Sequence, residues 1–137
     1  MLISTIRSLV RPYIPAKLTD AMQIGQVGEI AAQRYLKKIG YRILKTNWRH
    51  RNYEIDIVAL NAEILVFVEV RTRNLDALVS GYDSITKKKR ESLKTVFNAY
   101  LAKVGHVKHY RFDVIEVTSN GTDNTQELRH FENIPLW

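Results

Sequence analysis

The spacing of apolar residues along the chain predicts two helices. Residues 26–39 carry apolar side chains at helical intervals, and Gly40 follows as a residue typical of a helix end. The stretch "TKKKRESLKTVFNAYLAKVG" has a similar periodicity, with Thr86 as the expected N-cap and Gly105 as the expected end. We therefore expect one helix early in the chain and another after its middle.

Four segments have the short apolar pattern of strands: "RILKTN", "YEIDIVAL", "EILVFVEVRT" and "YRFDVIEV". A tight turn near Asn61 and Ala62 separates the second from the third, which predicts a hairpin. The uninterrupted apolar run from Ile64 to Val68 indicates a central strand covered on both faces. The tail "LRHFENIPLW" is expected to add an edge strand.

This order of elements, αβββαβ, predicts an α/β domain. We expect a mixed sheet of four to five strands with a helix packed on each face. Residues 1–24 are predicted to form an N-terminal extension whose first part is a short amphipathic helix ended by Pro12. Residues 25–137 are then the domain itself.

The positive net charge of the chain predicts polyanions as binding partners. Among 137 residues, 21 Lys and Arg outnumber 14 Asp and Glu, giving a net charge of +7 that attracts nucleic acid or anionic membrane. The alternative is a basic domain without such a partner.

The chain has no cysteine, which excludes disulfides and thiol catalysis and fits a cytoplasmic location. No apolar run is long enough to span a membrane.

Three acids interrupt apolar stretches. Asp56 and Glu69 lie in the two strands of the predicted hairpin, and Glu29 lies on the apolar stripe of the first helix. Inward acids are costly unless a cation joins them, and Mg²⁺ prefers such oxygen ligands. Arg71 shares the face of Glu69 and would contact a phosphate or the attacking water. Alternatively, Glu69 pairs with Arg71 or Arg73 at the surface and Asp56 begins a turn.

Two basic stretches are candidates for nucleic-acid contact. The second helix begins with a run of cations that oppose its macrodipole, which a bound phosphate would relieve; the alternative is a solvated charge run. In "NWRHRNY", Trp48 and Tyr53 flank basic residues, which suits stacking on bases, although Trp48 equally suits the core. The candidate contacts are Arg49, Arg51, Arg73, Lys87, Lys88, Lys89 and Arg90.

The blocks "GEIAAQRYLKKIGYRILKTNWR", "EIDIVA" and "LVFVEVRTR" resemble the YraN-type family of small uncharacterised bacterial proteins. That family is related to archaeal Holliday junction resolvases and has the restriction-endonuclease-like PD-(D/E)xK fold. The resemblance runs from Gly25 to Leu101 and implies a nuclease-type pocket in which Glu29, Asp56 and Glu69 bind Mg²⁺ or Mn²⁺. Arg71 completes the implied catalytic set, at the position of the family's lysine.

The chain departs from the family pattern at two positions. Arg71 replaces the usual Lys, which keeps the charge and can bind phosphate in a bidentate fork but cannot act as a base. Tyr53 replaces the usual Gly before the "EID" motif, where its ring would either crowd the site or stack on a base.

The resemblance and the charge together predict a metal-dependent, endonuclease-like protein that hydrolyses phosphodiesters of DNA, including branched DNA, or of RNA. DNA is the preferred partner in this prediction. The alternative is a weak or inactive nuclease fold that serves as a nucleic-acid-binding or protein-interaction module. A two-fold homodimer is also expected, because related resolvases act on two strands. For that dimer, "NIPLW" is a candidate surface, unless Trp137 closes the core.

Overall fold

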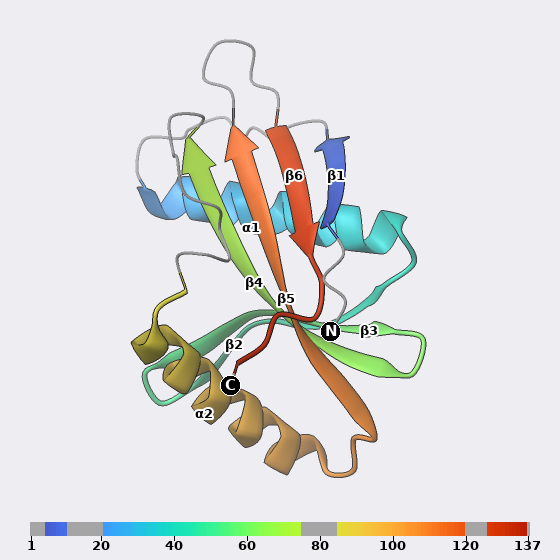
Figure 1. Ribbon diagram of the computed structural model, residues 1–137, viewed down its shortest axis with the longest axis vertical. Coiled ribbons are helices and arrows are strands. Elements are labelled where there is room, and N and C mark those ends of the chain that lie inside the picture. Colours follow the sequence, from blue (N-terminus) through green and yellow to red (C-terminus); the bar gives the residue numbers. More distant parts are fainter. Residues whose placement is uncertain (1–4, 11–20, 75–84, 120–125, 137) are drawn as a thin grey trace.

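A computed structural model describes residues 5–10, 21–74, 85–119 and 126–136 of the chain (Figure 1). These residues form six strands and two helices. The elements are β1 (Thr5–Val10), α1 (Ala21–Lys38), β2 (Arg42–His50), β3 (Tyr53–Asn61), β4 (Ile64–Asn74), α2 (Lys87–Val104), β5 (His109–Ser119) and β6 (Gln126–Phe131).

The strands form one mixed sheet in the order β1-β6-β5-β4-β3-β2. β4 and β5 are parallel and are connected through α2, whereas the other neighbouring strands are antiparallel. The predicted α/β class and mixed sheet are confirmed. The five predicted strands correspond to β2–β6, and β1 adds a sixth. The arrangement is consistent with the restriction-endonuclease-like core that the resemblance implies.

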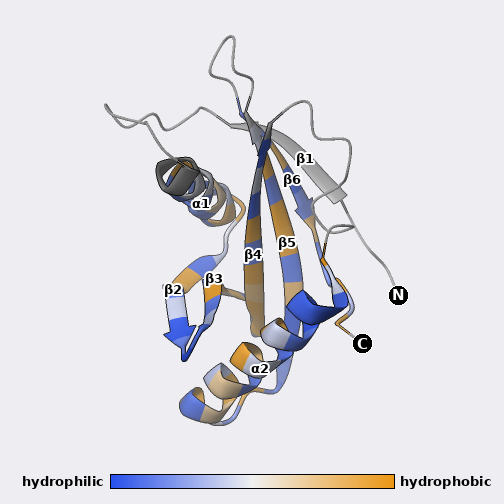
Figure 2. Cartoon of the chain, turned by 90° about the vertical axis from the view of Figure 1, so that its left-hand side faces the viewer, coloured by the Kyte–Doolittle hydropathy of each residue, from blue (hydrophilic) through white to orange (hydrophobic). Residues whose placement is uncertain are grey.

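The two helices lie on opposite faces of the sheet, as predicted (Figure 2). On the α2 side, the rings of Phe67 and Phe97 stack with centroids 4.2 Å apart. On the α1 side, Leu36 is fully buried in a cluster that includes Ile57 and Val68. Apolar side chains from both faces of β4 are therefore covered, as the continuous apolar run in this strand predicts.

Gly28 brings α1 close to the sheet. A Cβ atom at this position would lie 2.2 Å from Oγ1 of Thr72 in β4, far inside a van der Waals contact.

The predicted helix caps are present. Gly40 follows the C-terminal end of α1 and Gly105 follows that of α2, with positive φ values of 95° and 86°. The Thr86 hydroxyl accepts a hydrogen bond from the Lys89 N–H at 3.1 Å. The predicted caps are thereby confirmed.

The hairpin of β3 and β4 is also confirmed. It pairs from Asn61 with Ile64 to Ile57 with Val68, and Ala62 in the turn has a φ of 52°. The first residues of β3, before Ile57, do not pair with β4. Here the arm formed by β2 and β3 turns away from β4 (Figure 2).

β2 is the outer strand on this side of the sheet. Its pairing with β3 shifts register between Ile43 and Lys45, and Asn47 has a φ of 49°. β2 is therefore an irregular edge strand.

A buried polar network joins α1 to β5 and β6. His130 and Asp113 are fully buried, and Nε2 of His130 lies 2.7 Å from Oδ2 of Asp113. Arg111 donates to the same carboxylate at 2.9 Å, and the Tyr35 hydroxyl lies 3.1 Å from Nδ1 of His130. The Asn133 N–H donates to Asp113 at 3.0 Å. Each buried group in this network therefore has a partner.

Two expectations about the ends of the chain are wrong. Residues 5–10 form β1, not an amphipathic helix, and pair antiparallel with β6. This segment is short and rich in β-branched residues, and β6 offers it a row of peptide groups. As a result β6 lies between β5 and β1 and is not an edge strand. The division of the chain at residue 25 stays a prediction.

The proposed dimer surface in "NIPLW" is also wrong. Ile134 and Leu136 are buried in the cluster on the α2 side, and the Ile134 N–H donates to the Phe112 carbonyl at 2.7 Å. These residues are covered because the tail folds back beside β5. Trp137 lies outside the described residues.

Candidate metal centre and nucleic-acid interface

The site lies where β3 and β4 separate. At this point the Val70 N–H donates a 2.7 Å hydrogen bond to Oδ2 of Asp56, where a regular ladder would offer a backbone carbonyl. Asp56 therefore closes the end of the hairpin with its side chain. This fixes one of its carboxylate oxygens and places the group between the two strands.

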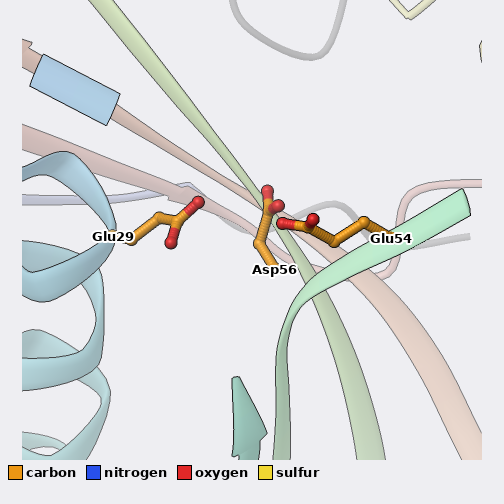
Figure 3. Close-up of side chains that lie close together, drawn as sticks. All are labelled: Glu29, Glu54 and Asp56. Carbon is orange, nitrogen blue, oxygen red and sulfur yellow. The ribbon is translucent and has the colours of Figure 1, made fainter. Parts of the chain in front are cut away.

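Glu29, Glu54 and Asp56 point toward one another (Figure 3). Glu29 comes from α1, and the other two lie on β3; one ligand oxygen of each lies within 4.8 Å of the others. Glu29 and Asp56 were predicted, but Glu54 was not included. Its signal was the "E-x-D" spacing, because residues two apart on a strand share a face.

Glu69 lies beside this group and is buried. Its Oε1 lies 3.1 Å from Nζ of Lys89. Nε of Arg71 is 3.8 Å from the same oxygen and is a buried N–H with no hydrogen-bond acceptor among the described residues. Glu69 is also one of the neighbouring acids that raise the pKa of Asp56. We call Glu29, Glu54, Asp56 and Glu69 the acidic site.

Burial and repulsion from neighbouring acids disfavour the charged forms of Asp56 and Glu29. The pKa of Asp56 is raised to about 8. Burial is the largest cause, repulsion from Glu69 and Glu29 adds to it, and the hydrogen bond from the Val70 N–H acts in the opposite direction. Burial also raises the pKa of Glu29, which Glu54 and Glu69 reinforce and Asn47 opposes. The protein thus holds Asp56 and Glu29 at a point where their negative charge is costly.

Asn47 holds two of the acids in place. Its side-chain amide donates to Oε2 of Glu29 at 2.9 Å and to Oε1 of Glu54 at 3.0 Å. Its φ of 49° interrupts the regular backbone of β2 at this point. Arg49 forms an ion pair with the second oxygen of Glu54 at 2.8 Å. Sequence reasoning missed Asn47, which has no signal in a polar strand.

The donor set fits a hard divalent cation. Carboxylate oxygens are the ligands that Mg²⁺ and Mn²⁺ prefer, and the oxygens of Glu29, Glu54 and Asp56 converge from two elements. A cation there would relieve the repulsion that raises the pKa of Asp56. Glu69, predicted as a ligand, lies next to these three but is shared with Lys89.

The predicted nucleic-acid contacts fall into two groups. Lys87 and Lys88 at the start of α2, and Arg51 in the turn between β2 and β3, are exposed. The others make contacts within the protein. Arg49 and Lys89 pair with acids of the site, and Nη1 of Arg90 donates to the Pro135 carbonyl at 3.0 Å. Arg73 is partly buried at the end of β4.

Trp48 packs on the protein. Its ring meets Tyr100 edge-on with centroids 5.1 Å apart, and it is partly buried against the cluster on the α2 side. The core alternative for Trp48 is therefore correct. Tyr53 lies at the start of β3, also partly buried against this cluster.

The sequence of this domain matches a known family. The model of the uncharacterised protein family UPF0102 matches residues 28–117, which include all four acids and Arg71. The chain belongs to the UPF0102 family. This confirms the YraN-type resemblance.

Three curated UPF0102 proteins match this chain over almost all of their own lengths. One from Pelotomaculum thermopropionicum is 40% identical over 85% of this chain and 98% of its own. One from Alkaliphilus oremlandii is 40% identical over 81% and 96%, and one from Herpetosiphon aurantiacus is 37% identical over 85% and 97%. The family's description names no activity. The roles of the acidic site and of the exposed cations in this UPF0102 member therefore stay predictions.

Neither helix in the described ranges of this UPF0102 protein is long and apolar enough to cross a membrane.

Proposed function

We propose that this protein is a metal-dependent phosphodiesterase that acts on nucleic acid, with DNA preferred over RNA. The observation that carries the proposal is the convergence of Glu29, Glu54 and Asp56 at the fork between β3 and β4. Partly buried acids that lie this close together are maintained at a cost, and a functional role explains that cost.

Glu29, Glu54 and Asp56 would hold Mg²⁺ or Mn²⁺, with Glu69 as a further oxygen donor beside them. The bound ion would supply a Lewis acid and an activated water. Hydrolysis of a phosphodiester needs both, together with donors for the developing charge on the phosphate.

Arg71 and Lys89 would contact the scissile phosphate. Both cations lie against Glu69, within 3.8 Å and 3.1 Å of its Oε1, at the edge of the acidic site. The buried Nε–H of Arg71 lacks an acceptor among the described residues, and a phosphate oxygen would provide one. Arg71 would stabilise charge and would not accept a proton.

The exposed cations would bind the rest of the nucleic acid. Lys87 and Lys88 follow the capping residue of α2, where a phosphate is favoured by the helix dipole. With a net charge of +7, binding should be salt-dependent and largely independent of sequence.

Cleavage assays test the catalytic part of the proposal. The protein should cut branched, single-stranded or duplex DNA with Mn²⁺ or Mg²⁺, and Asp56→Asn should abolish cutting while DNA binding remains. Glu63→Gln, an exposed acid in the turn between β3 and β4, is the matched control. If the wild type cuts none of these substrates with either metal, the fold is better explained as one kept for binding alone.

Anisotropy titrations test the binding part. Replacing Lys87 and Lys88 together with Gln should weaken duplex binding and lower the salt slope by about 2, since each phosphate contact contributes about 0.9. The control replaces Lys37 and Lys38, two exposed lysines in the last turn of α1. Equal loss in both double variants would show that net charge alone, not this surface, determines binding.

A further inference from the structure

A pocket extends from the acidic site toward α2. It has a volume of about 380 Å³ and lies between the start of β3 and the first turns of α2. Glu54 and Asp56 line it at the end that joins the acidic site, and Lys89 lines it from α2. The catalytic proposal uses that end of the pocket and leaves the remainder without a role.

The remainder of the pocket has both apolar and polar walls. Leu93 and Val96 are buried core residues of α2, so this wall of the pocket is formed by the apolar core itself. Tyr53 from β3 is the aromatic residue among those that line the pocket. Asn52 supplies an amide for a polar edge. The Ser92 hydroxyl donates to the Lys88 carbonyl at 3.1 Å, so its oxygen serves as an acceptor.

These walls match the parts of a nucleotide. A base has two apolar faces and a polar edge, and stacking on an aromatic side chain is the usual way proteins hold a base that is not paired. The phosphate of the same nucleotide is anionic and would reach Lys89 and the metal ligands at the other end. The volume is at the small end of ligand pockets, so it suits one such unit and not a base pair.

We propose that this pocket binds one unpaired nucleotide of a nucleic-acid strand, with the base against Tyr53 and the phosphate toward Lys89 and the acidic site. The inference rests on the proposed function and makes it specific: substrates with a single-stranded flap, gap or displaced base are favoured over continuous duplex. A base within a duplex is stacked and paired, so it would first have to leave the helix, at a cost of free energy.

Binding and fluorescence measurements test this pocket without cleavage. The probes are a blunt DNA duplex and the same duplex with a short flap whose first unpaired base is 2-aminopurine. Both are measured with Ca²⁺, a hard cation that binds oxygen ligands. The wild type should bind the flap about tenfold more tightly than the blunt duplex, and stacking should quench the 2-aminopurine.

Variants assign that preference to the pocket. Tyr53→Ala should remove the quenching and the preference but keep the affinity for blunt duplex, whereas Tyr53→Phe should keep both. Ser92→Phe fills the pocket and should act like Tyr53→Ala while preserving the Tyr53 ring. Tyr110→Ala removes an exposed tyrosine at the start of β5, which is not among the residues that line the pocket, and should change nothing.

The possible outcomes separate this inference from the proposed function. Equal affinity of the wild type for flap and blunt duplex, or quenching that survives Tyr53→Ala, would overturn the pocket assignment even if the protein cuts DNA. A flap preference that depends on Tyr53, with no cutting under any metal, would support the pocket and overturn the catalytic proposal. Failure to bind either probe at low salt would overturn both.

Discussion

At the scale of single residues, Asp56 determines the character of the site. Its carboxylate accepts a backbone hydrogen bond from Val70 and also faces Glu29, Glu54 and Glu69. The first contact is structural, because it closes the hairpin where the strands separate. The second is electrostatically costly. A neutral side chain with an oxygen at this position would keep the first and remove the second.

Asp56→Asn should therefore stabilise the metal-free protein, by on the order of 1 kcal/mol. Burial and neighbouring acids raise the pKa of Asp56 to about 8, so between about pH 4 and pH 8 the folded protein holds a proton that the unfolded chain has lost, and stability falls as pH rises. The gain in melting temperature should thus be larger at pH 8 than at pH 5. Thermal unfolding at both pH values measures it, and a lower melting temperature at both would contradict the expectation.

The same variant should lose its response to metal. Mn²⁺ should raise the melting temperature of the wild type, because an ion that binds only the folded state stabilises it, and should have little effect on Asp56→Asn. Glu63→Gln should respond like the wild type. An unchanged Mn²⁺ shift in Asp56→Asn would show that the ion binds elsewhere.

Arg71 differs in chemistry from the lysine that the resemblance implies at this position. Arg71→Lys should preserve or increase any cleavage, because the charge beside Glu69 remains and a lysine can also exchange a proton. Arg71→Gln should lower cleavage about tenfold or more, since it removes a donor for the phosphate charge. Single-turnover rates with saturating protein measure both, and equal rates for Arg71→Gln and wild type would exclude this role.

Residues of the site could be predicted where they violate a local pattern. Glu29, Asp56 and Glu69 are acids in apolar surroundings, and that mismatch is visible in the sequence. The E-x-D spacing places Glu54 on the same face of β3 as Asp56, whereas Asn47 occupies an ordinary polar position. Asn47 joins Glu29 to Glu54 through contacts between α1, β2 and β3, which local patterns do not encode.

At the scale of elements, the position of α1 brings Glu29 to β3. Gly28 precedes this residue and lies directly against Thr72 of β4, so the absence of a side chain sets how closely the helix approaches the sheet. Gly25, one turn earlier in the same helix, has no atom within 4 Å of an added Cβ. The two glycines therefore offer a matched comparison.

Gly28→Ala should destabilise the fold by about 1–3 kcal/mol and weaken Mn²⁺ binding, since α1 must move away from Thr72. Gly25→Ala should instead stabilise it by about 0.5–1 kcal/mol through helix propensity. Thr72→Ala should partly rescue Gly28→Ala because it removes the atom at 2.2 Å, whereas Thr72→Val should not. Denaturant unfolding of the four variants tests this, and equal effects at the two glycines would contradict it.

The elements themselves were largely predictable, with one exception. Both helices and β2–β5 follow from periodicity and caps that lie within each segment. β1 has only six residues, and its pairing partner β6 lies more than a hundred positions later in the chain. A segment whose structure is set by so distant a partner has a weak local signal, and its apolar residues equally fit a helix.

At the scale of the whole molecule, the network around Asp113 joins β5, β6 and α1 on the side of the sheet that α1 covers. Burial alone would raise the pKa of Asp113, but hydrogen bonds from His130, Arg111 and the Asn133 N–H hold it below its usual 3.8. The folded protein thus stabilises the ionised form of the Asp113 carboxylate. The network links segments that are far apart in the chain.

Asp113→Asn should cost about 3 kcal/mol at pH 7, because Arg111 loses its charged partner in a largely buried place. The wild type gains from this carboxylate above the pKa of the unfolded chain, near 3.9, and loses the gain as pH falls through the lower pKa of the folded state. The difference between the two proteins should therefore shrink below pH 4. Urea unfolding at pH 7 and pH 3.5 measures it, and a constant difference would refute this account.

The irregular edge strand β2 limits how copies of this protein can meet. A sheet that ends in an exposed strand can be extended by a strand of another molecule, which is a route to aggregation. In β2, the shift between Ile43 and Lys45 and the left-handed backbone at Asn47 interrupt the straight row of peptide groups that an added strand needs. Edge-to-edge polymerisation is therefore disfavoured on this side, and a two-fold dimer would have to form through another surface.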